Sequence, residues 1–190
     1  MTMDDILKKV QDFADHSHGE QQRRYEKARY IVHPVRVMET CRQFTNDITI
    51  LSAALLHDVL EDTPVTRTEL YDFLLTAMNK DQASRTTLLV EELTDVFTKA
   101  NYPQYKRRQR KDMEAKRVSQ TSADAQTIKY ADIIDNIREI TEQDPDFARV
   151  FLSEYRSLLK RIPKGNEDLY KTAVSKLNEE IKKSDSTSIG

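Results

Sequence analysis

Four polar side chains fall close together in an otherwise apolar part of the chain: His57, Asp58, Glu61 and Asp62. The seven residues before them, 50–56, are apolar apart from one serine. At about 100° per residue in a helix, His57 and Glu61 form one stripe, with Asp58 and Asp62 beside it. A helix that is apolar on its other sides is buried, so its charged sector has to face something that compensates it. A metal ion would do so, and a buried network of ion pairs with lysine or arginine is the alternative.

Two further segments each bring a candidate ligand. His33 stands just before Pro34 at the expected start of a helix, and Asp132 lies in a second apolar segment. Together with His57 and Asp58 they form a set of two imidazoles and two carboxylates. Such a mixed nitrogen and oxygen set suits Mn²⁺, Fe²⁺ or Zn²⁺ and argues against Ca²⁺ or Mg²⁺. Coordination positions would remain for water and substrate.

This constellation resembles the HD-domain metal-dependent phosphohydrolases, in which a first histidine, a His-Asp pair and a distant aspartate hold the metal. Within that superfamily it is most similar to the hydrolase domain of the Rel/Spo alarmone enzymes and their small stand-alone relatives. Those enzymes remove the 3′-pyrophosphate from ppGpp. The likeness covers roughly residues 10 to 140, and a long His-Asp block is far more specific than a His-Asp dipeptide. The blocks that carry it are 22–24 with 30–34, 53–63, 89–94 and 128–136.

The resemblance implies a role for each site residue. One divalent cation, with Mn²⁺ as the first choice, would be held by a set of four ligands: His33, His57, Asp58 and Asp132. Glu61 and Asp62 would position and deprotonate the attacking water, although either one alone could instead orient a ligand imidazole. Arg24 aligns with the family arginine that stacks on the purine. Asn136 would hydrogen-bond the ribose or a phosphate, with a structural side-chain cap as the alternative.

The chain departs from the family pattern around the substrate. The family turn Gly-Glu-Pro-Tyr before the first histidine is replaced by residues 26–30, Glu-Lys-Ala-Arg-Tyr. Tyr25 stands where the family tends to have a lysine, and Ile133 and Asp135 replace an arginine and a histidine of the final block. The metal and water chemistry is therefore expected more firmly than ppGpp as substrate. A nucleoside 5′-phosphatase and a non-catalytic helical module that binds nucleic acid or a partner stay open as alternatives.

The number of histidines favours one metal. The chain has 4 His, and the two not yet assigned, His16 and His18, lie in a polar segment before Gly19. We expect both to be solvent-exposed loop residues. Dinuclear HD phosphodiesterases need additional histidines for a second metal, so the scarcity argues against that class.

A basic segment at 105–117 is the second notable feature. Seven of its thirteen residues are lysine or arginine. The default expectation is a solvated helix with i, i+4 ion pairs such as Asp112 with Lys116. The functional alternative is that one or two of Arg107, Arg110 and Lys111 clamp substrate phosphates, because arginine matches phosphate bidentately. Nucleic-acid binding is disfavoured, since the chain has a net charge of −2 and the segment lacks interleaved aromatics.

Composition indicates a cytoplasmic protein, and the resemblance implies a small-molecule nucleotide as its substrate. Charged residues make up 33% of the chain, which gives a well-solvated surface without a global field for DNA or membrane. The single cysteine, Cys41, lies on an expected apolar face and is assigned to the core of a protein in a reducing compartment. No apolar stretch reaches the roughly 18 residues of a membrane span, and the first residues are acidic where a signal peptide is basic. The oligomeric state cannot be derived from these features.

The elements that must position these residues are predicted to be helices alone. With 3 Gly and 5 Pro in 190 residues, turn signals are sparse, and no useful alternating pattern indicates strands. We expect an all-α, single-domain HD-type bundle over residues 1–183 and a disordered tail at 184–190. No nucleotide-synthesising domain is expected, so an alarmone enzyme of this kind would only degrade. The pattern predicts about nine helices, at 3–15, 34–45, 48–60, 67–78, 82–98, 103–120, 123–142, 145–160 and 166–183.

Overall fold

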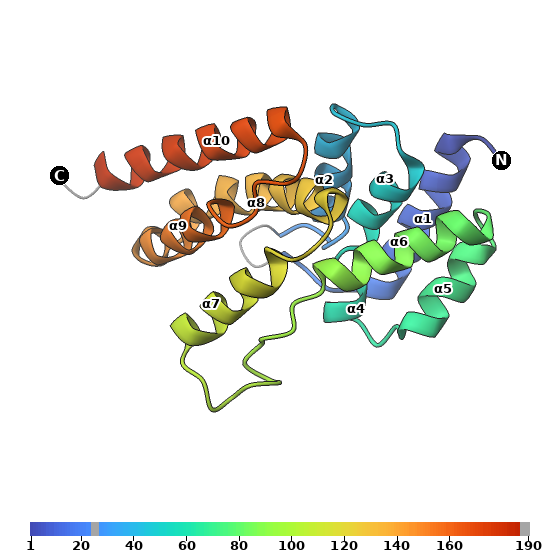
Figure 1. The fold of residues 1–190 in the computed structure, drawn as a ribbon, viewed down its shortest axis with the longest axis horizontal. Helices are drawn as coiled ribbons and strands as arrows, with labels where there is room; N and C mark the ends of the chain where they lie inside the picture. The colour runs from blue at the N-terminus through green and yellow to red at the C-terminus, as the bar shows by residue number, and fades with distance from the viewer. Residues whose placement is uncertain (24–26, 187–190) are drawn as a thin grey trace. The chain divides into compact units, whose positions relative to one another are not determined.

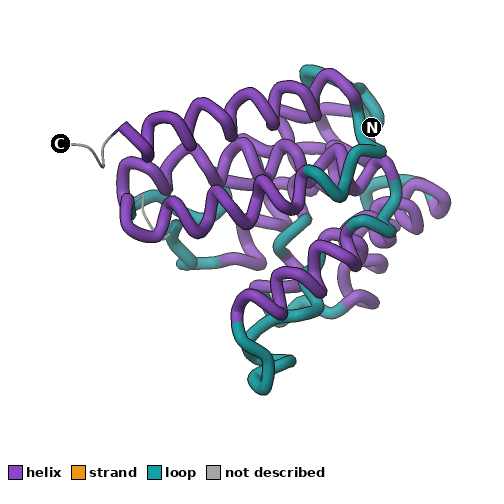
Figure 2. The backbone as a smooth tube through the Cα atoms, turned by 60° about the vertical axis from the view of Figure 1, so that its left-hand side comes forward, coloured by secondary structure: helices purple, strands orange, loops and turns teal. Residues whose placement is uncertain are grey.

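The computed structural model describes residues 1–23 and 27–186, and these residues form ten helices and an isolated antiparallel bridge between Gln22 and Arg29 (Figure 1). The chain divides into two compact units, Met1–Thr94 and Asp95–Gly190. Figure 2 shows the helices and the loops that join them. The all-α fold expected from sequence is confirmed, whereas the single domain over residues 1–183 stays a prediction. Within the described residues, no helix combines the length and the apolar character that crossing a bilayer demands.

The N-terminal unit is built around one central helix. Its helices are α1 (Met3–His18), α2 (Val32–Arg42), α3 (Ile48–Leu56), α4 (Val59–Asp62), α5 (Arg67–Leu75) and α6 (Lys80–Leu93). Helix α3 packs against α1, α2 and α6, and all its residues from Thr49 to Leu56 are buried. Apolar residues occupy every side of α3, so only an enclosed position removes them all from water. The expected core position of Cys41, on α2, is confirmed.

The start of α3 is fixed by the cap expected from sequence. The Asp47 carboxylate accepts a hydrogen bond from the backbone N–H of Thr49 at 2.9 Å. The same carboxylate forms an ion pair with Arg85 of α6 at 2.7 Å. Burial acts to raise the pKa of Asp47, but the hydrogen bonds from Thr49 and the charge of Arg85 outweigh it and hold the pKa below its ordinary value. The Asp47 side chain therefore caps the first turn of α3 and also joins this helix to α6.

The C-terminal unit contains the longer helices. They are α7 (Arg107–Val118), α8 (Ala123–Gln143), α9 (Pro145–Leu159) and α10 (Glu167–Ser186). Helices α8, α9 and α10 pack against one another, and α7 packs on α9. The apolar side chains between them are fully or almost fully buried, among them Ile128, Ile133, Ile137, Leu152, Leu159, Leu169 and Leu177.

The connection between α9 and α10 is fastened to α8, the helix that carries Asp132. The hydroxyl of Tyr130 donates to the carbonyl of Ile162 and accepts from the backbone N–H of Gly165 at 3.0 Å. A Cβ at Gly165 would lie 2.6 Å from the Tyr130 ring, so only glycine allows this close approach. The N–H of Asn166 donates to the Thr127 hydroxyl at 2.8 Å, which holds the start of α10 on the same helix.

Several predicted helix boundaries differ from the structure by three residues or more. The helix expected over 48–60 is interrupted between α3 and α4, which explains why ten helices form instead of about nine. Helix α6 ends at Leu93 and does not reach 98, because Thr94 adopts an extended conformation with ψ 123°. Helix α10 continues to Ser186, so residues 184–186 are helical where a disordered tail was expected. The remaining tail residues, 187–190, lie outside the described part of the chain.

Candidate metal centre

The interruption between α3 and α4 places His57 and Asp58. In a continuous helix the carbonyl of Ala54 would accept the N–H of Asp58. Here the imidazole Nδ1 of His57 donates to that carbonyl at 2.8 Å, and a new helical turn starts with Asp58 as its cap, at φ −99° and ψ −4°. The two stripes expected from an unbroken helix are therefore not formed. The side chains of His57 and Asp58 come from a turn instead, where they can point in the same direction.

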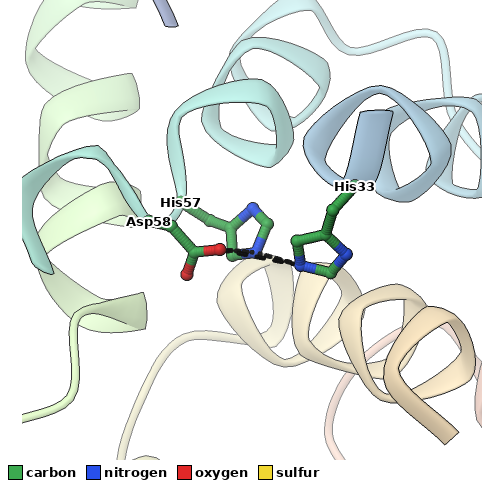
Figure 3. A group of neighbouring side chains, drawn as sticks. All are labelled: His33, His57 and Asp58. Atoms are coloured by element: carbon green, nitrogen blue, oxygen red, sulfur yellow. Dashed lines mark hydrogen bonds and ion pairs between the residues drawn. The ribbon is translucent and has the colours of Figure 1, made fainter. Parts of the chain in front are cut away.

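His33 joins these two residues from a second helix. It lies in the first turn of α2 and is 1% exposed, while His57 is 3% exposed. In Figure 3 the two imidazoles and the Asp58 carboxylate point toward one another. His33 Nε2 lies 3.2 Å from His57 Nε2, and Asp58 Oδ2 lies 3.0 Å from His57 Nε2 and 3.6 Å from His33 Nε2. We call His33, His57 and Asp58 the His-Asp cluster.

The spacing of the His-Asp cluster fits a single cation. For a cation about 2.1 Å from each ligand atom, neighbouring ligands lie about 3.0 Å apart at a right angle and about 3.4 Å apart at a tetrahedral angle. The separations of 3.0 and 3.2 Å fall within that range, and the separation of 3.6 Å lies just above it. His57 Nε2 carries a lone pair, because Nδ1 holds the proton that bonds to the Ala54 carbonyl. Nε2 can therefore accept a hydrogen bond from His33 Nε2 or bind a cation. The donors are the nitrogen and oxygen types expected for Mn²⁺, Fe²⁺ or Zn²⁺.

Further groups hold the ligands in orientation. The bond from His57 Nδ1 to the Ala54 carbonyl fixes the tautomer that leaves the Nε2 lone pair for a metal. The Tyr30 hydroxyl donates to Asp58 Oδ2 at 2.5 Å. Sequence reasoning missed Tyr30, which lies in a turn before α2 and therefore carries no periodic signal.

Glu61 and Asp62, the proposed water-activating residues, lie on α4 directly after the His-Asp cluster. Both side chains are exposed, and the backbone N–H groups of both bond to the Asp58 carbonyl, at 3.2 and 2.9 Å. Asp62 Oδ2 accepts a hydrogen bond from Gln21 Nε2 at 3.2 Å. Their exposure leaves both carboxylates able to exchange protons with water.

Asp132 lies in the C-terminal unit, where its own helix surrounds it with partners. Its Oδ2 is 2.9 Å from Lys129 Nζ and its Oδ1 accepts from Asn136 Nδ2 at 2.6 Å. The Asn136 amide also lies 3.4 Å from the Tyr155 hydroxyl. We call Lys129, Asp132, Asn136 and Tyr155 the Lys129–Asp132 cluster. Asn136 thus contacts a carboxylate on its own helix, and its proposed hydrogen bond to the substrate stays a prediction.

Lys129 was missed as well, although its place three residues before Asp132 on a helix is a readable signal for an ion pair. Burial acts to lower the pKa of Lys129, but the negative charges of Asp132 and Asp95 outweigh it and raise the pKa well above its ordinary value. Burial also raises the pKa of Tyr155, and the charge of Asp132 adds to that rise. The lysine is therefore charged and the tyrosine neutral around neutral pH.

Arg107, one of three proposed phosphate clamps, is engaged within the C-terminal unit. Its guanidinium forms two hydrogen bonds to Glu154, at 2.8 and 2.7 Å. It also lies 5.0 Å from the centre of the Phe147 ring. These contacts explain the position of Arg107 without a phosphate, and its role in binding substrate stays a prediction.

The other two proposed clamps have internal contacts too. Arg110 donates to the carbonyl of Tyr105, and Lys111 Nζ lies 3.5 Å from Asp95. Asp112, which was expected to pair with Lys116, pairs with Arg161 at 2.6 Å. Much of the basic helix α7 is therefore neutralised locally, in line with a solvated structural helix.

The structure corrects the assignment of one histidine. Both histidines lie in helix α1 and not in a loop as expected. His16 is exposed as expected, but His18, the last residue of α1, is buried. Polar neighbours on both sides concealed its burial in the sequence. Arg24, the proposed purine-stacking residue, lies outside the described residues.

Comparison with known proteins places the chain in a family. The family model of the HD domain matches residues 11–163. A mouse relative, guanosine-3′,5′-bis(diphosphate) 3′-pyrophosphohydrolase MESH1, is 31% identical over 163 residues, which are 84% of this chain and 83% of the relative. The human protein of the same name is 30% identical with the same coverage. A guanosine-3′,5′-bis(diphosphate) 3′-pyrophosphohydrolase of Aquifex aeolicus is 30% identical over 166 residues, 86% of this chain but 20% of that longer protein.

A solved structure supports the fold independently. A metazoan orthologue of SpoT that hydrolyses ppGpp superposes with a TM-score of 0.74 at 23% identity, over 93% of this chain and 94% of that one. The fold, the converging His-Asp cluster and the relatives agree with one another. The chain belongs to the HD-domain family and, within it, to the guanosine-3′,5′-bis(diphosphate) 3′-pyrophosphohydrolases.

Proposed function

We propose that this protein hydrolyses the 3′-pyrophosphate of ppGpp or a closely related alarmone with one bound divalent cation, Mn²⁺ as first choice. The observation that carries the proposal is the convergence of His33 Nε2, His57 Nε2 and Asp58 Oδ2 at separations of 3.0 to 3.6 Å. The relatives named as pyrophosphohydrolases of this nucleotide support the substrate.

The ligand set proposed for the cation has four members. His33, His57 and Asp58 are supported by their geometry, and Asp132 by the resemblance of residues 128–136 to the final block of the family. When bound, the cation supplies Lewis-acid polarisation of the phosphoryl group and acidifies water. Tyr30 and the Ala54 carbonyl keep Asp58 and His57 in the orientation that binding requires.

Glu61 and Asp62 are proposed to take the proton from the attacking water. Support comes from their position within one turn of Asp58 and from their exposure, which connects them with solvent. Water attacks the phosphorus bonded to the 3′-oxygen, the P–O3′ bond breaks and pyrophosphate is released. The proton taken from water is returned by the carboxylate pair, through solvent, to the 3′-oxygen, which leaves a nucleoside 5′-diphosphate with a 3′-hydroxyl. Arg24 is proposed to stack on the purine, a contact worth about 0.5–2 kcal/mol, and Arg107, Arg110 and Lys111 stay weaker candidates for the phosphates.

A cytoplasmic location is part of the proposal. It rests on the free, buried Cys41, which suits a reducing compartment, and on the nucleotide substrate.

The test is a substrate panel with metal-stripped protein to which Mn²⁺ is returned. The panel contains ppGpp, pppGpp, ppApp, NADPH and nucleoside 5′-monophosphates. We expect pyrophosphate and GDP from ppGpp, and no product without metal. Orthophosphate released from the monophosphates alone would identify a nucleoside 5′-phosphatase instead. No turnover, together with salt-dependent retardation of DNA or RNA, would identify a binding module.

A further inference from the structure

His18 is a buried histidine whose hydrogen bonding is only half satisfied. It is the last residue of α1 and is 6% exposed. Its Nε2 is buried and makes no hydrogen bond to any residue in 1–23 or 27–186. A buried polar atom without a partner costs folding free energy, so a phenylalanine would serve better if this ring were needed for packing alone. The other ring nitrogen, Nδ1, lies 2.9 Å from Gln21 Oε1.

The partners of Gln21 fix which atoms face each other. Asp62 Oδ2 lies 3.2 Å from the Gln21 amide, and an ionised carboxylate only accepts hydrogen bonds, so the amide nitrogen must face Asp62. The amide oxygen then faces His18. Because an amide oxygen also only accepts, the proton of the imidazole must reside on Nδ1. One chain of hydrogen bonds thus runs from the buried ring of His18 through Gln21 to a carboxylate proposed to activate water.

The face of the His18 ring packs on Tyr30, which in turn holds a second carboxylate, that of Asp58. The His18 ring packs on the Tyr30 ring with centres 4.5 Å apart, and the Tyr30 hydroxyl donates to Asp58 Oδ2 at 2.5 Å. The backbone holds this arrangement, because Gly19 ends α1 at φ 52° and the N–H of Tyr30 bonds to the Gln21 carbonyl at 2.9 Å. The end of α1 and the turn before α2 are therefore joined where the ring sits.

We propose that His18 is a positioning residue for both carboxylates, orienting Asp62 through Gln21 by its Nδ1–H and Asp58 through Tyr30 by its ring face. The proposal rests on the proposed function, in which Asp62 activates water and Asp58 binds the cation. It gives separate roles to the hydrogen bond and to the ring, so the two can be removed one at a time.

Two substitutions at His18 separate the roles. His18→Phe keeps an aromatic ring against Tyr30 but removes the Nδ1–H donor. We expect kcat to fall roughly tenfold, a part of the 10²–10⁴ that a positioned base contributes, while affinity for Mn²⁺ stays within about twofold. His18→Asn keeps a donor at the Nδ1 position but removes the ring. We expect Mn²⁺ affinity to fall about tenfold, as for other outer contacts to metal ligands, and kcat at saturating Mn²⁺ to recover most of its value.

The control is His16→Phe, an equivalent change at an exposed histidine two residues earlier on α1, which should alter neither quantity. Loss of kcat and Mn²⁺ affinity together in both His18 variants would overturn the separate roles and leave a general packing residue. If His18 acts through Asp62, His18→Phe should cause no further loss of kcat once Asp62 has been changed to Asn, because the effects of coupled residues are not additive. A further loss of kcat in the Asp62→Asn background would overturn the route through Asp62.

A second measurement needs neither substrate nor an altered His18. Long-range ¹H–¹⁵N correlation spectra of the full-length protein report which ring nitrogen carries the proton. We expect the Nδ1–H tautomer for His18, and its loss in Gln21→Met, in which His18 keeps its place. The Nε2–H tautomer in the wild-type protein would overturn the proposal. If the wild-type protein releases no pyrophosphate from ppGpp, the proposed function is overturned instead. The tautomer of His18 and the Mn²⁺ affinities of its variants would then still test whether His18 is a positioning residue.

Discussion

Two clusters compensate their acidic groups in different ways. One is the His-Asp cluster of the N-terminal unit, and the other is the Lys129–Asp132 cluster of the C-terminal unit. Both bury acidic groups among helices. In the Lys129–Asp132 cluster, the two carboxylate oxygens of Asp132 contact Lys129 and Asn136, at 2.9 and 2.6 Å, on the same helix. In the His-Asp cluster, Asp58 and two imidazole Nε2 atoms converge on one another within 4.8 Å.

The two clusters differ in the source of the positive charge that compensates their carboxylates. Lys129 neutralises Asp132 before any metal arrives, and its raised pKa keeps it charged. The His-Asp cluster presents three lone-pair donors to a common point, an arrangement that is stable with a cation there. Removal of metal should therefore affect the His-Asp cluster most, because Lys129 still compensates the charge of Asp132. Removal of Lys129 should affect mainly the Lys129–Asp132 cluster.

The largest expected effect comes from the His-Asp cluster. His57→Ala removes one metal ligand together with the bond to the Ala54 carbonyl. We expect loss of bound metal and a fall in kcat/KM of at least about 10³-fold, because a catalytic cation contributes several kcal/mol to the transition state. Elemental analysis and product release on folded protein check this, with His16→Ala as the matched control. Full metal occupancy in His57→Ala would remove His57 from the ligands.

The next effect separates chemistry from metal binding. Changing Glu61 and Asp62 together to Gln and Asn should lower kcat by about 10²–10⁴-fold, the usual contribution of a positioned base, while metal stays bound and KM changes by a few-fold. Steady-state kinetics with metal analysis on the same sample measure both. Metal loss in parallel with activity would make the two carboxylates ligands, and a near-normal kcat would exclude them from the mechanism.

The third effect tests the ion pair between Lys129 and Asp132. Lys129→Met leaves the Asp132 carboxylate buried without its partner, and the lysine and aspartate side chains are 16% and 5% exposed. Breaking such a pair costs about 3–5 kcal/mol in the free energy of unfolding. Denaturant titration measures the loss. The double variant with Asp132→Asn should recover part of it, since the orphaned charge is gone, and an unchanged single variant would contradict the pairing.

The wild-type protein offers a pH control for the same pair. The folded-state pKa of Lys129 is raised, so its contribution to stability is fully present below the ordinary lysine value of about 10.4. That contribution is lost as the pH rises through the raised value. Lys129→Met should therefore remove part of the alkaline loss of stability.

The smallest effect concerns the orientation of Asp58. Tyr30→Phe keeps the ring but removes the hydroxyl that donates to Asp58 Oδ2 at 2.5 Å. Loss of such an outer contact lowers metal affinity by about 10–100-fold, and saturating Mn²⁺ should restore kcat. Isothermal titration with Mn²⁺ measures the shift, with Tyr102→Phe as a control in the other unit. An affinity equal to that of wild type would show that the hydroxyl does not orient the ligand.

The sequence was informative wherever residue type and adjacency carry the signal. The pair His57-Asp58, the cap at Asp47 and the apolar run of α3 were all readable, because each depends on neighbours in the chain. The break after α3 was not, since it follows from competition between the His57 imidazole and a backbone N–H for the carbonyl of Ala54. No proline or glycine marks that position.

Residues whose role depends on tertiary contacts were missed. His18 sits among polar residues, yet packing of its ring against Tyr30 buries it. Asn136 was assigned to substrate from its place one turn after Asp132. That same spacing also brings it into contact with the carboxylate, and its contact with substrate stays a prediction. Helical spacing shows which residues can meet but does not tell which partner a side chain prefers.

The central claim is that one divalent cation binds the His-Asp cluster. Anomalous diffraction from crystals of the full-length protein soaked in Mn²⁺ tests it most directly. We predict one strong anomalous peak within about 2.4 Å of His33 Nε2, His57 Nε2 and a carboxylate oxygen of Asp58. No peak there, or a peak that excludes either imidazole, would contradict the account.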